Sequence, residues 1–288
     1  RVITRLRMMT TMTKPSGTPR AVALGAALRE VREAKKFGLR ELSRALDIPA
    51  SLIVHWEAGS RTPGTDDVAN MLGFFRVIGA PKRRIMDLAR HVREPNWMTN
   101  GAAELTPELT TLLKYEQGAS KMTDWALNVI PGLLQTPDYA RTIFEASGLT
   151  GPQTDARIRV RLDRQKILTD RDPIRYAAII GIHAIDEPVV ASWVMSDQMD
   201  HLMAMSMRPN VSIRLVLRQE KYHPGMNGSF VMYEYDNRDP LVLLEQHSTT
   251  SFLSSDKDWG PYKQLARLLA GEALSEDASR AVIAEAAS

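Results

Sequence analysis

The chain of 288 residues contains no cysteine, which excludes disulfide bonds and thiolate metal sites. A chain without cysteine is typical of a reducing compartment, and we therefore expect a cytoplasmic protein. The sequence also lacks an apolar run of the ~18 residues that a membrane-spanning helix needs. Apolar residues make up 44% of the chain and charged residues 25%, a balance typical of a globular protein.

The motifs of several common enzyme classes are missing as well. The sequence has no HExxH, GxSxG, GxxxxGK[ST] or GxGxxG motif, and its six histidines have no local metal-ligand spacing. We therefore predict no enzyme activity, no catalytic residues, no metal and no cofactor. His183 lies in an apolar stretch at 180–185, and we interpret it as an interior histidine of a strand. An enzyme that uses His183 or His223 is the weaker alternative.

Positive charge is concentrated near the N-terminus. Residues 1–100 hold 18 Lys and Arg against 9 Asp and Glu, whereas the remaining residues hold 19 against 25. A basic N-terminal third is typical of a region that binds a polyanion through counterion release, although charges also cluster by chance.

The stretch at 39–63 reads as two short helices with a tight turn between them. The first apolar stripe is Leu39, Leu42 and Leu46, and the second is Leu52, Ile53 and Trp56. Between the stripes, Pro49 disfavours helix at the residue before it and suits the first turn of a new helix. Two helices joined by such a turn indicate a helix-turn-helix, whose second helix enters the DNA major groove.

Helical spacing on both sides of this stretch completes an all-α domain of five helices. We expect one helix at 21–35, one that begins at Thr65 or Asp66, and one at 82–92. The predicted domain spans residues 20–93, after a tail at 1–19 that we expect to be disordered or flexible. Within that tail, Met8, Met9 or Met12 is the expected native start.

After a polar linker at 94–104, the pattern changes to helices followed by strands. The segments expected to be helical or part-helical are 105–118, 124–129, 138–147, 155–169, 195–207, 259–269 and a short terminal helix from Ser275. The segments expected to be strands are 176–185, 211–217, 228–235, 240–246 and 251–253. We therefore predict an α+β domain at 105–288, with a mostly antiparallel or mixed sheet.

Residues 20–80 resemble the XRE/Cro-repressor family of helix-turn-helix regulators. The resemblance rests on the segment from Leu28 to Arg32 and on the ordered positions Trp56, Glu57, Gly59, Arg61 and Pro63. It implies a dimeric DNA-binding domain in which Arg32 pairs with Glu57. We interpret that pair as scaffold, because a bidentate contact would hold the recognition helix to the first helix.

The same resemblance assigns residues to the DNA-facing surface. Ala50, Ser51, Val54 and His55 fall on the exposed face of the recognition helix, where Ser51 and His55 can bond base edges or phosphate and Ala50 offers a methyl group. Arg40 and Arg61 are candidates for phosphate contacts, and ordinary solvent exposure is about as good an interpretation for Arg40. Family members often carry Ser or Thr in place of Pro49 and Gln in place of Leu39, so the operator sequence does not follow by analogy.

The segment from Trp125 to Ala140, WALNVIPGLLQTPDYA, resembles the opening of a domain of uncharacterised function. That domain follows an XRE-type domain in many actinobacterial regulators, some of them antitoxin-like. Further matches are RPNV at 208–211 and HPGMNGSF at 223–230. The resemblance implies a domain that senses a ligand or a small protein and supports dimerisation.

We name candidate pocket residues in this second domain, although Trp125 and Tyr139 are most simply core aromatics. The candidates are Trp125, Gln135, Tyr139, His223 and Phe230. The arginines at 157–164 are interpreted as the solvated face of a helix, with a nucleic-acid contact as the alternative. The methionines at 195–207 are interpreted as core residues, with a flexible surface for a ligand or partner as the alternative.

Two functional hypotheses follow from these features. The first is a sequence-specific transcriptional regulator that binds a near-palindromic operator as a homodimer and is controlled by a ligand or a small protein. The second is an antitoxin-like protein that sequesters a small partner protein and regulates its own operon.

Overall fold

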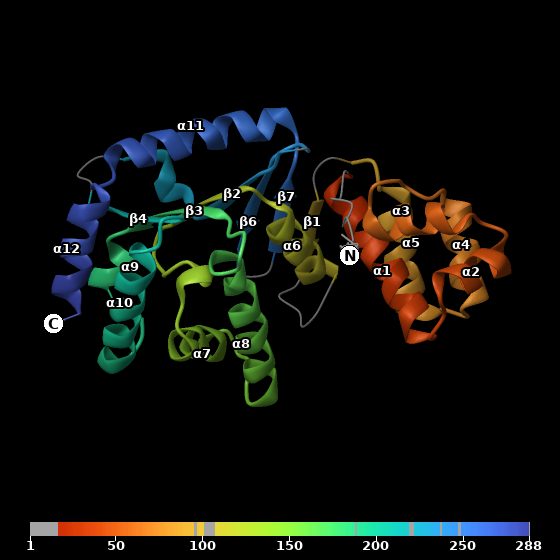
Figure 1. The fold of residues 1–288 in the computed structure, drawn as a ribbon, viewed down its shortest axis with the longest axis horizontal. Coiled ribbons are helices and arrows are strands. Elements are labelled where there is room, and N and C mark those ends of the chain that lie inside the picture. The colour runs from red at the N-terminus through yellow and green to blue at the C-terminus, as the bar shows by residue number, and fades with distance from the viewer. Residues whose placement is uncertain are drawn as a thin grey trace, which may run out of the picture. The chain divides into compact units, whose positions relative to one another are not determined.

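The computed structural model describes residues 17–94, 97–100, 107–187, 189–218, 222–236, 238–246 and 249–287. The chain divides into two compact units, residues 1–93 and residues 94–288 (Figure 1).

Five α-helices form the part of the first unit that the structure describes. They are α1 (Pro19–Ala34), α2 (Leu39–Leu46), α3 (Ala50–Ala58), α4 (Thr65–Phe74) and α5 (Gly79–Arg90). The hydroxyl of Thr18 accepts a hydrogen bond from the Ala21 amide at 3.2 Å, and Pro19 takes the first helical position. The structure differs from the expected tail at residue 19, because the first helix begins at Pro19. Residues 1–16 of that tail lie outside the described residues.

Helix α1 is the central helix of this unit and packs against α3 and α5. Nearly all of its first ten residues are buried, from Pro19 to Leu28. Gly25 permits the close approach to α3, because a Cβ atom there would lie 2.3 Å from the carbonyl oxygen of Trp56. The C-terminal part of α3 is thus held close to α1.

The second unit is built on a seven-stranded sheet with the order β1-β7-β6-β5-β2-β3-β4. The strands are β1 (Trp97–Asn100), β2 (Lys121–Ala126), β3 (Arg175–Gly181), β4 (Val211–Val216), β5 (Phe230–Glu234), β6 (Leu241–Glu245) and β7 (Thr249–Leu253). The β2–β3 and β3–β4 pairs are parallel, and the other pairs are antiparallel. The sheet is mixed, so the structure confirms the predicted fold class: a helical N-terminal domain followed by an α+β domain.

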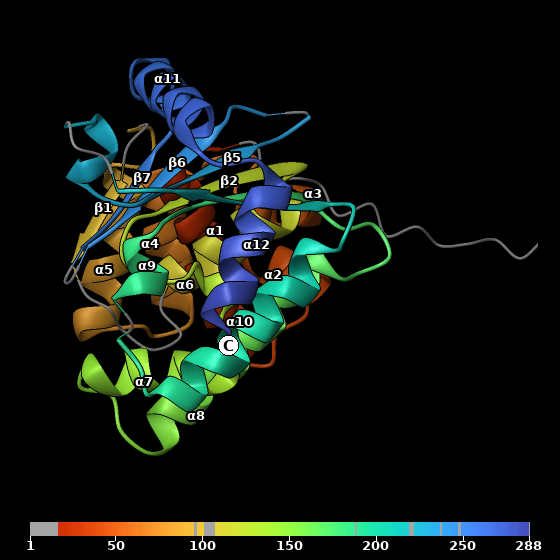
Figure 2. The same ribbon diagram turned by 90° about the vertical axis from the view of Figure 1, so that its left-hand side faces the viewer.

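Helices cover both faces of this sheet. They are α6 (Pro107–Gly118), α7 (Pro137–Ala146), α8 (Pro152–Gln165), α9 (His183–Asp186), α10 (Ser192–Ser206), α11 (Asp256–Glu272) and α12 (Glu276–Ala286), with short 3-10 helices η1 (Gly132–Leu134), η2 (Lys166–Leu168) and η3 (Pro224–Asn227). Helix α11 lies over one face, whereas α7, α8 and α10 lie on the other (Figures 1 and 2). The face under α11 carries an apolar cluster around Trp125, Phe230 and Leu269.

Three segments differ from the sequence-based expectations. The 124–129 segment was expected to be helical, but Lys121–Ala126 forms the strand β2, whose alternation is concealed by the buried polar residue Asp124. The segment at 94–104 was expected to be a linker, but Trp97–Asn100 forms an edge strand that pairs with β7. Residues 95–96 and 101–104 lie outside the described residues. The expected strand at 176–185 ends at Gly181, and helix α9 follows.

The interpretation of His183 as an interior strand residue is therefore wrong. His183 begins the short helix α9, its side chain is 36% exposed, and its Nδ1 lies 3.2 Å from Oε1 of Glu187. An apolar run alone did not reveal that the chain turns outward after β3.

Candidate functional site

The helix-turn-helix is formed by α2 and α3 with a short turn between them. Asp47 ends α2 in the left-handed conformation, with φ of 54°, and the Ile48 amide donates to the Ser43 carbonyl at 3.1 Å. Pro49 is the N-cap residue of α3. Ile53, Trp56 and Glu57 form the buried side of α3, which leaves its opposite side to solvent.

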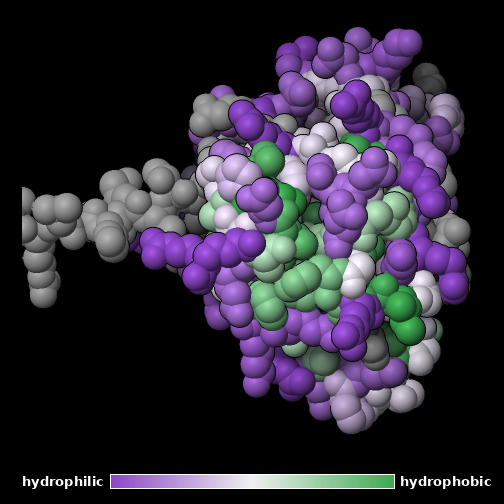
Figure 3. All heavy atoms as spheres, turned by 90° about the vertical axis from the view of Figure 1, so that its right-hand side faces the viewer, coloured by the Kyte–Doolittle hydropathy of each residue, from purple (hydrophilic) through white to green (hydrophobic). Residues whose placement is uncertain are grey.

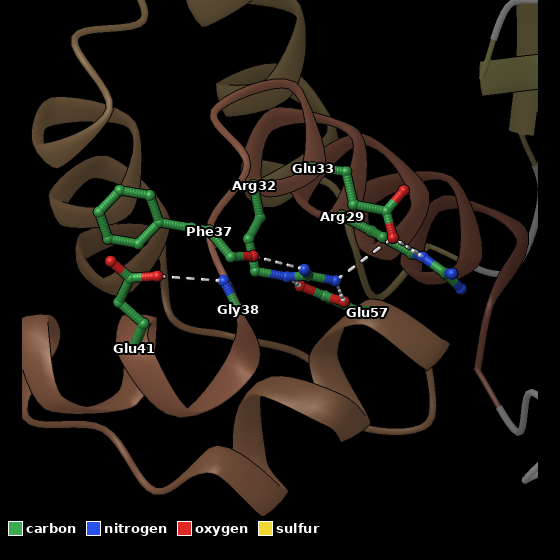
Figure 4. Close-up of polar contacts among 7 residues, drawn as sticks. All are labelled: Arg29, Arg32, Glu33, Phe37, Gly38, Glu41 and Glu57. Atoms are coloured by element: carbon green, nitrogen blue, oxygen red, sulfur yellow. Dashed lines mark hydrogen bonds and ion pairs between the residues drawn. The ribbon is translucent and has the colours of Figure 1, made fainter.

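A bidentate ion pair holds the C-terminal end of α3 to α1. Nε and Nη2 of Arg32 donate to the two carboxylate oxygens of Glu57 at 2.6 and 2.8 Å, and Nη1 donates to the Phe37 carbonyl at 2.8 Å (Figure 4). The two side chains are only 10% and 8% exposed. The hydrogen bonds that Arg32 donates to Glu57 raise the pKa of Arg32 above its ordinary value. The pair therefore connects α1, α3 and the end of the α1–α2 loop.

The residues proposed to contact DNA share the solvent side of this unit. Arg40, Ser51 and Arg61 are exposed, and Val54 is 38% exposed. Ala50 and His55 are half-buried, and Nδ1 of His55 lies 2.9 Å from the hydroxyl of Ser60. His55 thus has a protein contact of its own, which the sequence did not indicate.

Arg40 and Arg61 are unpaired cations among the described residues. Arg40 lies in the first turn of α2, where the helix dipole disfavours positive charge. Its position therefore does not stabilise the isolated helix.

The second unit contains a cavity of about 190 Å³ between the sheet and α8. Its sheet side includes Asp124 of β2, Tyr233 of β5 and Glu245 of β6. The other side is formed by α8, through Arg161 and Arg164, and by the loop that follows β2. That loop is the IPGLLQ segment at 130–135, and all of these residues except Leu134 line the cavity.

A buried polar network lies at the inner end of this cavity. Arg164 donates from Nε and Nη2 to the carboxylate of Glu116 at 2.9 and 2.6 Å, and the Tyr233 hydroxyl donates to the same carboxylate at 3.3 Å. The Tyr176 hydroxyl donates to Oδ2 of Asp124 at 3.0 Å. Burial raises the pKa of Asp124 to about 7, although the Tyr176 hydrogen bond opposes the rise.

The candidate pocket residues are separated by the structure into two groups. Gln135 and Phe230 line the cavity. Trp125, Tyr139 and His223 do not line it, and each has a structural contact. The Trp125 indole donates to the Gly225 carbonyl at 2.9 Å, the Tyr139 hydroxyl accepts from the Ile130 amide at 3.2 Å, and the His223 ring packs against Trp125 with ring centroids 6.1 Å apart.

The charged residues of the cavity were missed by the sequence analysis. The interpretation of 157–164 as a solvated face is wrong for Arg161, which lines the cavity, and for Arg164, whose side chain is 13% exposed. Their spacing of three residues, which places both on one helix face, was the available signal. No sequence pattern placed Asp124 and Glu245 at the cavity, because this requires knowing which strands they belong to and where those strands lie in the sheet.

Comparisons with known proteins match both units. Residues 23–85 match a family model described as a helix-turn-helix domain, and residues 109–285 match one described as a domain of unknown function, DUF5753. The helix-turn-helix match supports a DNA-binding regulator. No curated protein matches the chain.

None of the described helices is long and apolar enough to cross a membrane. In the same part of the chain, no three His, Asp or Glu side chains converge to hold a metal ion.

A solved structure also matches, with a TM-score of 0.30 and 13% identity over 83% of this chain and 88% of that chain. It is described as TrmBL2, an archaeal chromatin protein with a novel mode of DNA binding. A TM-score this low carries no argument about this chain.

Proposed function

Because the chain belongs to the DUF5753 family, and its N-terminal unit matches a helix-turn-helix domain, we propose that it is a cytoplasmic, sequence-specific transcriptional regulator. In this proposal α3 enters the major groove, with Ser51, Val54 and His55 toward base edges. Arg40 and Arg61 contact phosphates on either side. The observation that carries the proposal is the exposed face of α3, opposite an end that is tied to α1 by Arg32 and Glu57.

The proposed regulator acts as a homodimer. Two copies of α3 would then lie about 34 Å apart on a near-palindromic operator. Exposed apolar side chains of the first unit support a contact surface: Phe74 is 41% and Ile78 is 78% exposed, beside an aromatic cluster of Phe37, Phe74 and Phe75. One face of the molecule shows a hydrophobic area surrounded by hydrophilic residues (Figure 3).

The second unit is proposed to control DNA binding through a bound ligand or partner. The cavity beside α8, which combines apolar walls with charged groups, supports a ligand site. This division assigns DNA reading to residues 20–93 and sensing to residues 105–288.

Selection of DNA from a randomised duplex library by the purified full chain tests the proposal. We expect enrichment of a near-palindromic sequence, and an affinity that falls steeply as salt rises. Arg40→Ala and Arg61→Ala should each reduce the slope of log affinity against log salt by about 1. Arg90→Ala is the matched control, because Arg90 is an exposed arginine on α5 and should leave the slope unchanged. Salt-insensitive binding, or no enriched sequence, would contradict the proposal.

An antitoxin-like protein that sequesters a small partner is the second candidate function. It is favoured by a groove of about 740 Å³ between α11, η3 and the ends of β5 and β6. Leu268 on its α11 side is 41% exposed. Purification from the native host distinguishes the two functions, because a stoichiometric small protein favours the antitoxin-like function and a bound small molecule favours the sensor.

A further inference from the structure

Arg161 differs from the other arginine of the cavity in having no acidic partner. Arg164 has two hydrogen bonds to Glu116, whereas Nη1 of Arg161 donates to the neutral amide oxygen of Gln135. Nε of Arg161 is buried without a hydrogen-bond partner. Among the described residues, no carboxylate lies within ion-pair distance of Arg161. Glu245 and Glu116 act on its charge only from a longer distance, so the guanidinium has no carboxylate in direct contact.

The surroundings of Arg161 make its charge unfavourable. A cation that is removed from water without a partner destabilises the folded state. Burial, together with the nearby charge of Arg164, lowers the pKa of Arg161 to about 10, so the guanidinium remains protonated near neutral pH. An anion in the cavity would remove this penalty.

The guanidinium is nevertheless held in one place. It lies over the Phe144 ring, with Cζ 4.3 Å from the ring centroid, and it packs against Gly132. Gln135, which accepts from Nη1, is itself fixed by donating to the Ile130 carbonyl at 2.7 Å. A guanidinium held in advance loses little conformational freedom when it binds a planar anion.

The position of the cavity in the fold also fits a ligand site. It lies at the carboxyl end of β2, which is parallel to β3, and it is closed by the loop that follows β2. In open sheets with parallel strands, ligands bind outside the carboxyl ends of those strands. A volume of about 190 Å³ corresponds to about six water molecules, so the occupant is small.

We propose that this cavity binds a small carboxylate, and that Arg161 is the residue that holds the carboxylate group. The proposal deepens the sensor role assigned to the second unit and rests on it only for the effect on DNA. Asp124 and Glu245 line the same cavity and provide acidic groups for a protonated amine on the ligand. The bound compound is therefore a simple organic acid or an α-amino acid, and both share the carboxylate that Arg161 recognises.

Direct binding to the full chain tests the site without DNA. Calorimetric titrations use straight-chain carboxylates of increasing length, the matching primary amides, and the α-amino acids. We expect one or more carboxylates to bind and their amides not to bind. Arg161→Gln should weaken that binding by about ten-fold or more, because a charge-assisted hydrogen bond is lost. Preference for an amino acid over the matching simple acid would identify the amino-acid class.

Two further variants make the result interpretable. Arg159→Gln removes an exposed arginine from the same helix and should leave the affinity unchanged. Arg161→Lys keeps the charge and should retain part of the affinity, which a merely structural role would not explain. Binding by no member of the panel, or equal binding by wild type and the folded Arg161→Gln variant, would overturn the proposal.

Measurement of DNA binding on the same samples separates this inference from the proposed function. Loss of specific DNA binding in all samples, with carboxylate binding intact, overturns the regulator and leaves the carboxylate site. Specific DNA binding without any carboxylate binding overturns the carboxylate site and leaves the regulator.

Discussion

The two units bury arginines in different ways. In the helix-turn-helix unit, Arg32 is fully paired by Glu57 and by a backbone carbonyl. In the second unit, Arg164 has the same kind of bidentate partner in Glu116, but Arg161 contacts only neutral groups, the Gln135 amide and the Phe144 ring. A buried cation whose partner lies in the protein is part of the scaffold. The proposed carboxylate would give Arg161 the direct partner that the protein does not supply.

The largest expected effect comes from breaking the scaffold pair. Glu57→Ala removes the bidentate partner of Arg32 and leaves only the half-exposed Glu33, 3.5 Å from its Nη2, so we expect the first unit to lose about 3 kcal/mol of stability. Hydrogen exchange measured on peptides from each unit separately checks this value, because the second unit should keep its protection. A loss below about 1 kcal/mol would show that the pair is not essential to the scaffold.

The pH dependence of the second unit tests whether Asp124 is buried as described. Burial raises the folded-state pKa of Asp124 from 3.8 to about 7, so the folded state holds a proton that the unfolded state has released. The contribution is fully present below pH 4 and is lost as the pH rises toward 7.

Between pH 4 and pH 7, the free energy of unfolding of the second unit should fall by at most about 1.4 kcal/mol per pH unit because of Asp124. Asp124→Asn removes this part of the pH dependence. Urea unfolding of both proteins from pH 4 to pH 8 measures the difference, and parallel curves would contradict the predicted ionisation.

Arg161 should behave in the opposite way to Arg32. Because Arg161 is buried with no carboxylate in direct contact, Arg161→Gln should leave the second unit equally stable or stabilise it by about 1 kcal/mol in the absence of ligand. Urea unfolding monitored by hydrogen exchange gives the value for this unit. Destabilisation by more than about 2 kcal/mol would mean that Arg161 is a structural residue. It would contradict the contrast with Arg32, because both buried arginines would then stabilise their units.

The smallest effect is expected at an exposed pair. Arg29 and Glu33 form an i,i+4 ion pair at 2.7 Å on α1, with side chains 58% and 50% exposed. Arg29→Ala should therefore cost no more than about 0.5 kcal/mol in chemical denaturation. This variant is the control for Glu57→Ala, since both break a carboxylate–arginine pair that involves α1. An equal loss in both would show that burial does not set the strength of these pairs.

Local patterns were sufficient for the first unit. The stripes of Leu39–Leu46 and the break at Pro49 predict two helices and their turn, because helix periodicity and proline stereochemistry act over a few residues. The same approach failed at Asp124, where a polar side chain faces the inside of a sheet and conceals the alternation of the strand. It failed again at His183, because an apolar run does not reveal where a buried strand ends.

The sequence by itself determined the helix-turn-helix, the basic N-terminal third and the fold class of the second unit, since each depends on near neighbours or on composition. Only the tertiary structure decided which arginines are paired. Glu116 and Arg164 are 48 residues apart, and Asp124 and Tyr176 are 52 apart. Strand order and helix packing bring such residues together, and no local rule specifies which of them remains without a partner.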